Sequence, residues 1–150
     1  MTIDSKIFAD RVYEQMILLG YDAQKLAKEI GVSHTTVYDL LKCKYQQPST
    51  IVFFRLLELF HCSADYLLGF LEFPTENVVY HTPLSTYGTR IRELLQKHDI
   101  KQKIFCQDMH ISSALLYKWL TDKTLPSVEY LIKLAKYFDM SVDIFIKRIQ

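Results

Sequence analysis

The sequence contains few of the residues that form turns. Glycine and proline number four each in 150 residues, well below typical usage of about 7% and 5%. So few turn residues disfavour a many-stranded sandwich or barrel and favour a mostly helical fold. The three cysteines, Cys43, Cys62 and Cys106, lack CxxC spacing. They therefore predict reduced thiols rather than disulfides or a metal site.

The sequence also lacks a strong charge of either sign and any long apolar run. Lys and Arg number 18 against 17 Asp and Glu, a formal net charge of +1, so a case for nucleic acid must be local. No stretch reaches the roughly 18 apolar residues of a membrane span, and the first residues do not resemble a signal peptide. We expect a cytoplasmic protein with no membrane association. The absence of phosphate-binding, zinc-protease and paired-carboxylate motifs leads us to expect no enzymatic activity, no cofactor and no metal.

What the sequence does contain is a repeat of itself, at an offset of 79 residues that becomes 78 after a one-residue deletion. Matching positions at a fixed offset indicate two copies of one domain. We expect domains at residues 1–70 and 86–150, joined by a short linker at 71–85, with an extended segment at 78–80 that packs on a neighbour. The aligned pairs include Arg11 and Arg90, Ser33 and Ser112, Tyr38 and Tyr117, Ser63 and Ser141, and Asp65 and Asp143.

Each copy is predicted to form five short helices, which gives an all-α fold. Apolar residues recur at helical spacing from Phe8 to Leu19, and Gly20 ends that helix. Polar residues that favour the first position before a helix precede most of the other apolar stretches. The expected helix caps are Asp22, Ser33, Ser49 and Ser63 in the first copy, and Thr86, Ser112, Ser127 and Ser141 in the second.

The second and third helices of each copy are separated by about three residues, as in a helix-turn-helix. Ala27 in the first copy and Cys106 in the second are small enough for two helices to cross closely. Gly31 and His110 are expected to adopt the positive φ that the turn requires. This spacing predicts that the third helix, at about 34–42 or 113–120, presents its outer face to the major groove of DNA.

On that face, hydroxyl and imidazole groups would contact base edges and lysines would contact phosphates. A solvated helix face is the alternative interpretation of the same residues, and Leu115 would equally suit a protein-docking surface. The candidate DNA-binding residues are His34, Thr35, Thr36, Tyr38, Asp39, Lys42 and Lys44 in the first copy, and Ser113, Ala114, Leu115, Tyr117, Lys118 and Lys123 in the second.

The stretches 26–33, 60–69 and 117–127 resemble the Cro/repressor-type (Xre-like) helix-turn-helix domains, and the resemblance covers residues 5–70 and 86–148. It implies five-helix DNA-binding domains, used commonly as dimeric transcriptional repressors. In such domains a glutamine at the start of the second helix binds phosphate. The second copy has this residue, Gln102, between Lys101 and Lys103, whereas the first has Ala23. The usual glycine after the recognition helix is Cys43 in one copy and Asp122 in the other.

We therefore predict a bacterial or phage transcriptional regulator, a repressor, that binds double-stranded DNA as a homodimer. Residues 1–73 carry a net charge of −2 and residues 74–150 one of +3, so the two copies are expected to contribute unequally. The alternative is a protein-interaction or antitoxin-like module, in which one or both helix-turn-helix copies dock a protein partner through faces such as Ala114–Leu115.

Overall fold

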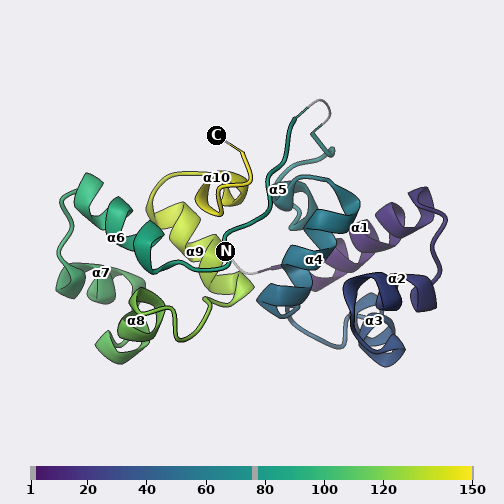
Figure 1. Cartoon of the computed structure of the whole chain (residues 1–150), viewed down its shortest axis with the longest axis horizontal. Helices are drawn as coiled ribbons and strands as arrows, with labels where there is room; N and C mark the ends of the chain where they lie inside the picture. The colour runs from purple at the N-terminus through teal and green to yellow at the C-terminus, as the bar shows by residue number, and fades with distance from the viewer. Residues whose placement is uncertain (1–2, 76–77, 150) are drawn as a thin grey trace.

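The computed structural model describes residues 3–75 and 78–149, and in these ranges it is entirely helical, without strands. Helices α1–α5 form the first repeat and α6–α10 the second (Figure 1). This arrangement confirms the predicted all-α fold of two five-helix units. The helices are α1 (Ser5–Leu18), α2 (Ala23–Ile30), α3 (His34–Leu41), α4 (Thr50–Phe60), α5 (Ala64–Leu67), α6 (Gly88–Lys97), α7 (Gln102–Met109), α8 (Ser113–Leu120), α9 (Val128–Tyr137) and α10 (Val142–Phe145). No helix among the described residues combines the length and apolar character needed to cross a membrane.

Side-chain oxygens cap most helix starts where the sequence predicts them, since each satisfies a backbone N–H that the helix leaves unpaired. The expected cap at Thr86 is wrong. Helix α6 begins at Gly88, and Oδ1 of Asp122 accepts hydrogen bonds from the backbone N–H groups of Tyr87 (3.0 Å) and Gly88 (2.8 Å). A carboxylate 34 residues away in sequence therefore replaces the local hydroxyl. The confirmed caps are Asp22, Ser33, Ser49, Ser63, Ser112, Ser127 and Ser141.

The repeated arginine joins the first helix to the last in each repeat. The Arg11 guanidinium donates to the carbonyl of Tyr66 and lies over the tyrosine ring, 4.4 Å from its centroid. Its counterpart Arg90 donates to the carbonyls of Ile144 (3.1 Å) and Phe145 (3.0 Å). Each arginine thus satisfies carbonyls at the end of a four-residue helix, which explains why the repeat retains it.

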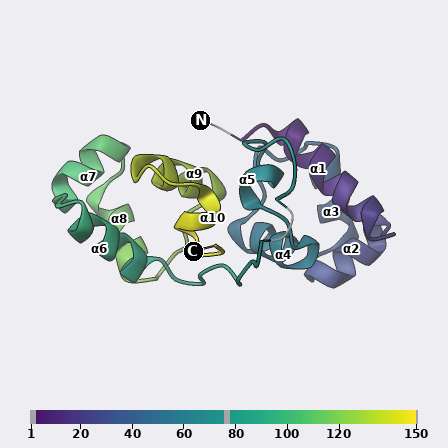
Figure 2. The ribbon, with the colours of Figure 1, turned by 90° about the horizontal axis from the view of Figure 1, so that it is seen from above.

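The two repeats pack against each other through α4 and α5 on one side and α9 and α10 on the other. These helices occupy the middle of the molecule in both ribbon views (Figures 1 and 2). The Thr50 hydroxyl donates to the carbonyl of Pro126 at 2.7 Å, and the backbone N–H of Glu129 donates to the Gln47 side chain at 2.8 Å. The core residues of both repeats form one continuous cluster of buried side chains.

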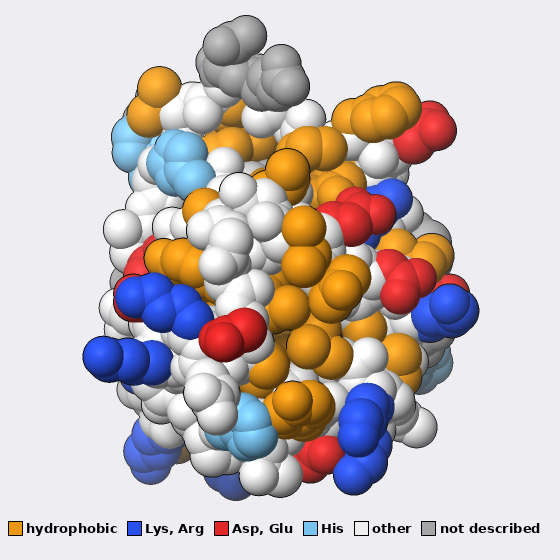
Figure 3. Space-filling model, turned by 90° about the vertical axis from the view of Figure 1, so that its right-hand side faces the viewer, with side chains coloured by type: hydrophobic (Ala, Val, Ile, Leu, Met, Phe, Trp, Pro, Cys, Tyr) orange, Lys and Arg blue, Asp and Glu red, His pale blue; other side chains and the backbone are white. Residues whose placement is uncertain are grey.

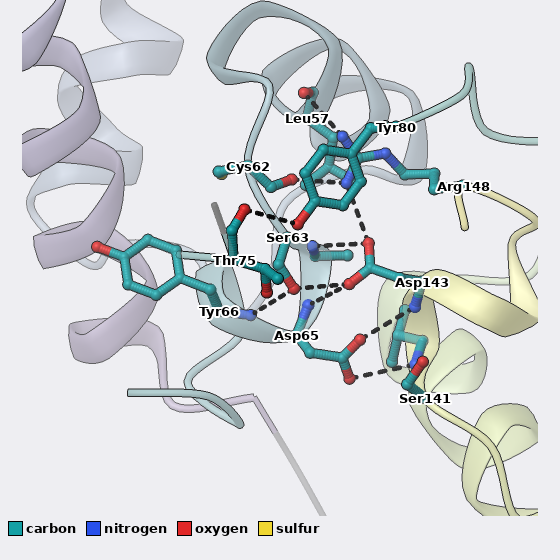
Figure 4. A network of polar contacts seen from close by, with 12 residues as sticks. Leu57, Cys62, Ser63, Asp65, Tyr66, Thr75, Tyr80, Ser141, Asp143 and Arg148 are labelled. Atoms are coloured by element: carbon teal, nitrogen blue, oxygen red, sulfur yellow. Dashed lines mark hydrogen bonds and ion pairs between the residues drawn. The ribbon is translucent and has the colours of Figure 1, made fainter. Parts of the chain in front are cut away.

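At the centre of this interface, two aspartates cap each other's helices (Figure 4). The Asp143 carboxylate accepts hydrogen bonds from the Ser63 hydroxyl (2.7 Å) and from the backbone N–H groups of Ala64 (2.9 Å) and Asp65 (3.2 Å). In return, the Asp65 carboxylate accepts from the backbone N–H groups of Val142 (3.1 Å) and Asp143 (3.0 Å). The two Ser-x-Asp motifs thus contact each other reciprocally, which indicates an approximate two-fold axis between the repeats.

Arg148 closes the interface from the second repeat. Its buried guanidinium donates to the carbonyls of Cys62 (2.6 Å) and Leu57 (3.2 Å) and pairs with Asp143 at 3.0 Å. It also lies over the ring of Tyr80, 4.4 Å from the centroid. The buried Tyr80 shows that the predicted linker packs on its neighbours. Its extended stretch forms no strand within the described residues, and positions 76 and 77 of the linker lie outside them.

Candidate nucleic-acid interface

The two helix-turn-helix pairs, α2–α3 and α7–α8, lie at opposite ends of the molecule. In Figure 1 both pairs lie along its lower side, with the packed α4, α5, α9 and α10 between them. Because the repeats are related by an approximate two-fold axis, α3 and α8 lie on the same side of the molecule. This is the arrangement that a helix-turn-helix dimer needs to place two helices on one face of a duplex.

The first helix-turn-helix forms as the sequence predicts. Ala27 is buried at the contact between α2 and α3, and Gly31 has a φ of 70° at the turn. The Ser33 hydroxyl accepts from the backbone N–H of Thr36 at 3.2 Å, which caps α3. With Val37 buried on the inner side, the opposite side of α3 faces solvent.

The outer face of α3 is polar, but its side chains are not equally free. The Thr36 hydroxyl is half-buried and bonds to that of Ser33 at 2.8 Å, so it belongs to the cap. The rings of His34 and Tyr38 meet edge to face at 4.5 Å between centroids, and the Lys42 ammonium lies 5.6 Å from the Tyr38 ring. The exposed candidates of the first repeat are His34, Thr35, Tyr38, Lys42 and Lys44.

Asp39 is half-buried and already has partners. Lys44 pairs with it at 3.0 Å and the hydroxyl of Tyr45 donates to it at 3.3 Å. The hydrogen bond from Lys44 lowers the pKa of the Asp39 carboxyl below its usual value. The pair neutralises one of the two lysines expected to meet phosphate on this side. Tyr45 was not identified from the sequence, because its role depends on a turn after α3 that has no regular period.

The second helix-turn-helix has the same design with different residues. His110 takes the positive φ of the turn, at 55°, as predicted for this position. The Ser112 hydroxyl accepts from the backbone N–H of Leu115 at 3.1 Å and caps α8. Leu116 and Trp119 are buried beneath α8, so the opposite side of this helix also faces solvent.

The outer face of α8 is less polar and more cationic than that of α3. Leu115 is half-buried and packs against the core, whereas the Lys123 ammonium lies 5.1 Å from the ring of Tyr117. None of the lysines on this side forms an ion pair within the part of the chain that the structure describes. The exposed candidates of the second repeat are Lys101, Gln102, Lys103, Ser113, Ala114, Tyr117, Lys118 and Lys123.

The starts of α2 and α7 differ in charge. Asp22 precedes α2, and its carboxylate accepts from the backbone N–H of Lys25 at 2.8 Å. Lys101 precedes α7 and provides no side-chain acceptor to the helix. A phosphate approaching α2 would meet a negative charge, whereas one approaching α7 would meet unpaired N–H groups and a cation.

Several candidates of the second repeat surround one groove. A cavity of about 410 Å³ lies between α7 and α8. Gln102, Lys103 and Ser113 line it together with the apolar Cys106 and Leu116. Residues from both helices therefore converge on one surface. No group of three or more His, Cys, Asp or Glu side chains that could hold a metal occurs in residues 3–75 and 78–149.

Comparison with known proteins agrees with this geometry. A family model described as helix-turn-helix matches the chain twice, at residues 12–67 and 91–145, which together span most of its length. No curated protein and no solved structure matches the chain. Each matched region extends from the first helix of a repeat into its last, so the match includes both candidate interfaces.

Proposed function

Because the chain belongs to the helix-turn-helix family of DNA-binding regulators, we propose that it is a sequence-specific transcriptional repressor that binds duplex DNA through both repeats in the cytoplasm. The observation that carries this proposal is the presence of two solvent-facing third helices, α3 and α8, on one side of a molecule with one continuous core. Repression is the role implied by the resemblance to Cro-type repressors.

In the first repeat, base contact is proposed for the exposed side chains of α3. Thr35 is exposed near the start of α3 and offers a hydroxyl and a methyl group to base edges. His34 and Tyr38 present their rings beside it. Lys42 would contact phosphate, while Asp39 and Lys44 would set the charge of the surface through their own pair.

The second repeat is proposed to make most of the phosphate contacts. Lys101, Gln102 and Lys103 stand at the unoccupied start of α7, and Lys118 and Lys123 lie on and just beyond α8. The major groove of the DNA would then face the outer side of α8, which carries Ser113, Ala114, Leu115 and Tyr117. With so few cations per repeat, each repeat would bind weakly and with strong salt dependence, and both would be needed together.

The test is selection of bound sequences from random duplex DNA at two salt concentrations. We expect one enriched sequence motif for the intact chain. Thr35→Ala should relax recognition in one part of that motif, and Ser113→Ala with Lys118→Ala in another. Lys147→Ala is a control, because Lys147 follows α10 and pairs with Glu93 of α6 at 3.8 Å, outside both helix-turn-helix pairs, and should leave the motif unchanged. Absence of any binding at low salt would refute the proposal.

One observation favours the alternative of a protein-interaction module. Hydrophobic side chains form a band across the outer end of the first repeat (Figure 3), and α1 exposes Tyr13, Ile17 and Leu18. The aligned positions in the second repeat are Arg92, Gln96 and Lys97. An apolar band present in only one copy is a feature of binding surfaces. If Tyr13→Arg with Ile17→Gln abolished function in cells while DNA binding persisted, this surface would have a role of its own.

A further inference from the structure

We propose that a single chain occupies a whole operator, with α3 in one half-site and α8 in the other, so that its target is an asymmetric duplex sequence of two unlike half-sites. This inference rests on the proposed function and specifies the DNA that the same interface recognises. It departs from the homodimer expected from sequence, since it requires one chain per operator.

The surface joining the repeats is already filled. Ser63, Asp65 and Asp143 are only 1%, 7% and 2% exposed, because each repeat covers the other's last helix. Five hydrogen bonds to the two carboxylates run between the repeats, and Asp143 also accepts one from Arg148 of its own repeat. A second chain would have to break them to use the same surface, and two carboxylates would then remain buried or unpaired.

That surface is also symmetric. Reciprocal contacts between Ser63-x-Asp65 and Ser141-x-Asp143 are the pattern of a two-fold interface, in which the same patch meets itself. Within one chain this relation sets α3 and α8 on the same side. Two-fold related helix-turn-helix units bind half-sites about 34 Å apart on one face of a duplex. One chain therefore already presents two third helices on one side, as other helix-turn-helix proteins do by pairing.

The outer faces of α3 and α8 differ chemically. At aligned positions, His34 and Thr35 of α3 correspond to Ser113 and Ala114 of α8, and Thr36 corresponds to Leu115. An imidazole and a threonine hydroxyl favour base edges that accept or donate hydrogen bonds, whereas Ala114 favours apolar contact with a thymine methyl group. Two unlike faces related by symmetry select inverted half-sites of different sequence.

The two ends of the molecule also differ in their attraction for phosphate. Asp22 closes the start of α2, and Lys44 is neutralised by Asp39. The start of α7 is open beside Lys101, and residues 74–150 carry the net positive charge of the chain. Binding should therefore have one preferred orientation. Affinity for the half-site that the second repeat binds should fall more steeply as salt is added.

The experiment measures the stoichiometry and the orientation of the complex on the sequence selected from random DNA. Cys43 is exposed directly after α3, and Cys62 is buried, so with Cys106→Ala an iron chelate that cleaves DNA can be attached to Cys43 alone. We expect a complex of one chain per duplex, by native mass spectrometry, and cleavage at one end of the site. Two chains per site with cleavage at both ends would overturn the inference while leaving the proposed function intact.

A second measurement uses the DNA instead of the protein. Each half-site is duplicated and inverted to give two palindromes of the same length as the selected site. Each mismatched base pair weakens specific binding, so we expect both palindromes to bind about tenfold more weakly than the asymmetric site, or weaker still. Equal or tighter binding of either palindrome overturns the inference, and absence of binding to every duplex overturns the proposed function with it.

Discussion

Asp65 and Asp143 exchange hydrogen bonds, because the backbone N–H of each residue donates to the carboxylate of the other, at 3.2 and 3.0 Å. An acidic residue in the first turn of a helix ordinarily interacts with its own helix. Here each one serves the helix of the other repeat. Two short helices that would fray in isolation therefore receive part of their capping from the other repeat.

The two carboxylates should make stability depend on pH. Burial, with the neighbouring Asp143 carboxylate, raises the pKa of Asp65 from 3.8 to about 6. Between these values the folded chain retains a proton that the unfolded chain has lost, so the free energy of unfolding falls as the pH rises from about 4 to 6. We expect Asp65→Asn to remove this decline. Thermal unfolding of both proteins across this range measures it, and parallel curves would refute it.

Asp143→Asn provides a contrast of opposite sign. Burial alone would raise the pKa of Asp143, but hydrogen bonds with Asp65, with the Ser63 hydroxyl and with backbone N–H groups hold it below its usual value. Its charged form therefore stabilises the fold above pH 3.8, and that contribution disappears as the pH falls below this value. The variant should lose stability at neutral pH and approach the wild type in acid.

The two equivalent cap serines should differ in importance. Ser63 caps α5 and also donates across the interface to Asp143, whereas Ser141 only caps α10. Loss of a cap removes about 1 kcal/mol of stability, and loss of a buried hydrogen bond to a charged group removes about 1.5–3 kcal/mol more. Urea denaturation of Ser63→Ala and Ser141→Ala should show the larger loss in the former. Equal losses would mean that the Ser63 contact contributes nothing.

Glycine should have opposite effects at the two positions that follow the recognition helices. Cys43 and Asp122 both have positive φ, 58° and 56°, a conformation that glycine adopts without strain. Cys43→Gly should leave stability unchanged or raise it by up to about 1 kcal/mol. Asp122→Gly should lower it by about 1–2 kcal/mol, because α6 loses its cap. Denaturation midpoints compare the two directly, and a shift of the same sign would contradict the assignment.

Lysines on the two reading faces should differ in the salt dependence of DNA binding. Removing a lysine that contacts phosphate lowers the slope of log affinity against log salt by about 1. We expect this change for Lys118→Ala. Lys44→Ala should produce a smaller one, because Asp39 already neutralises Lys44 at 3.0 Å. Titrations at four or more salt concentrations provide the slopes, and a larger effect at Lys44 would show that its ion pair opens on DNA.

Local signals explain how much of the fold could be predicted from the sequence. The repeat was detectable because positions such as Arg11 and Arg90 perform the same task in both copies. Serine caps fixed the starts of most helices because capping depends on neighbouring backbone. Thr86 failed as a cap because Asp122 reaches α6 from another part of the chain. Contacts of that kind have no signature at short sequence separation.

The interface between the repeats could be detected in the sequence but not interpreted from it. Ser63-x-Asp65 and Ser141-x-Asp143 align as repeated motifs, yet an aspartate in a first turn is equally suited to its own helix. Only the folded arrangement shows that each carboxylate serves the other repeat. The candidate DNA-binding residues stay predictions, and the structure refines them by identifying which side chains, such as Asp39, already have partners.

The buried contacts of Arg148 also determine when the interface between the repeats can form during synthesis. The guanidinium reaches back to the carbonyls of Leu57 and Cys62, which leave the ribosome long before it. At about 5–20 residues per second, the first repeat waits roughly 4–17 seconds for that side chain. During this interval the start of α5 lacks the Asp143 carboxylate that later accepts its backbone N–H groups. Translation speed through the second repeat therefore sets how long the newly made first repeat lacks this contact.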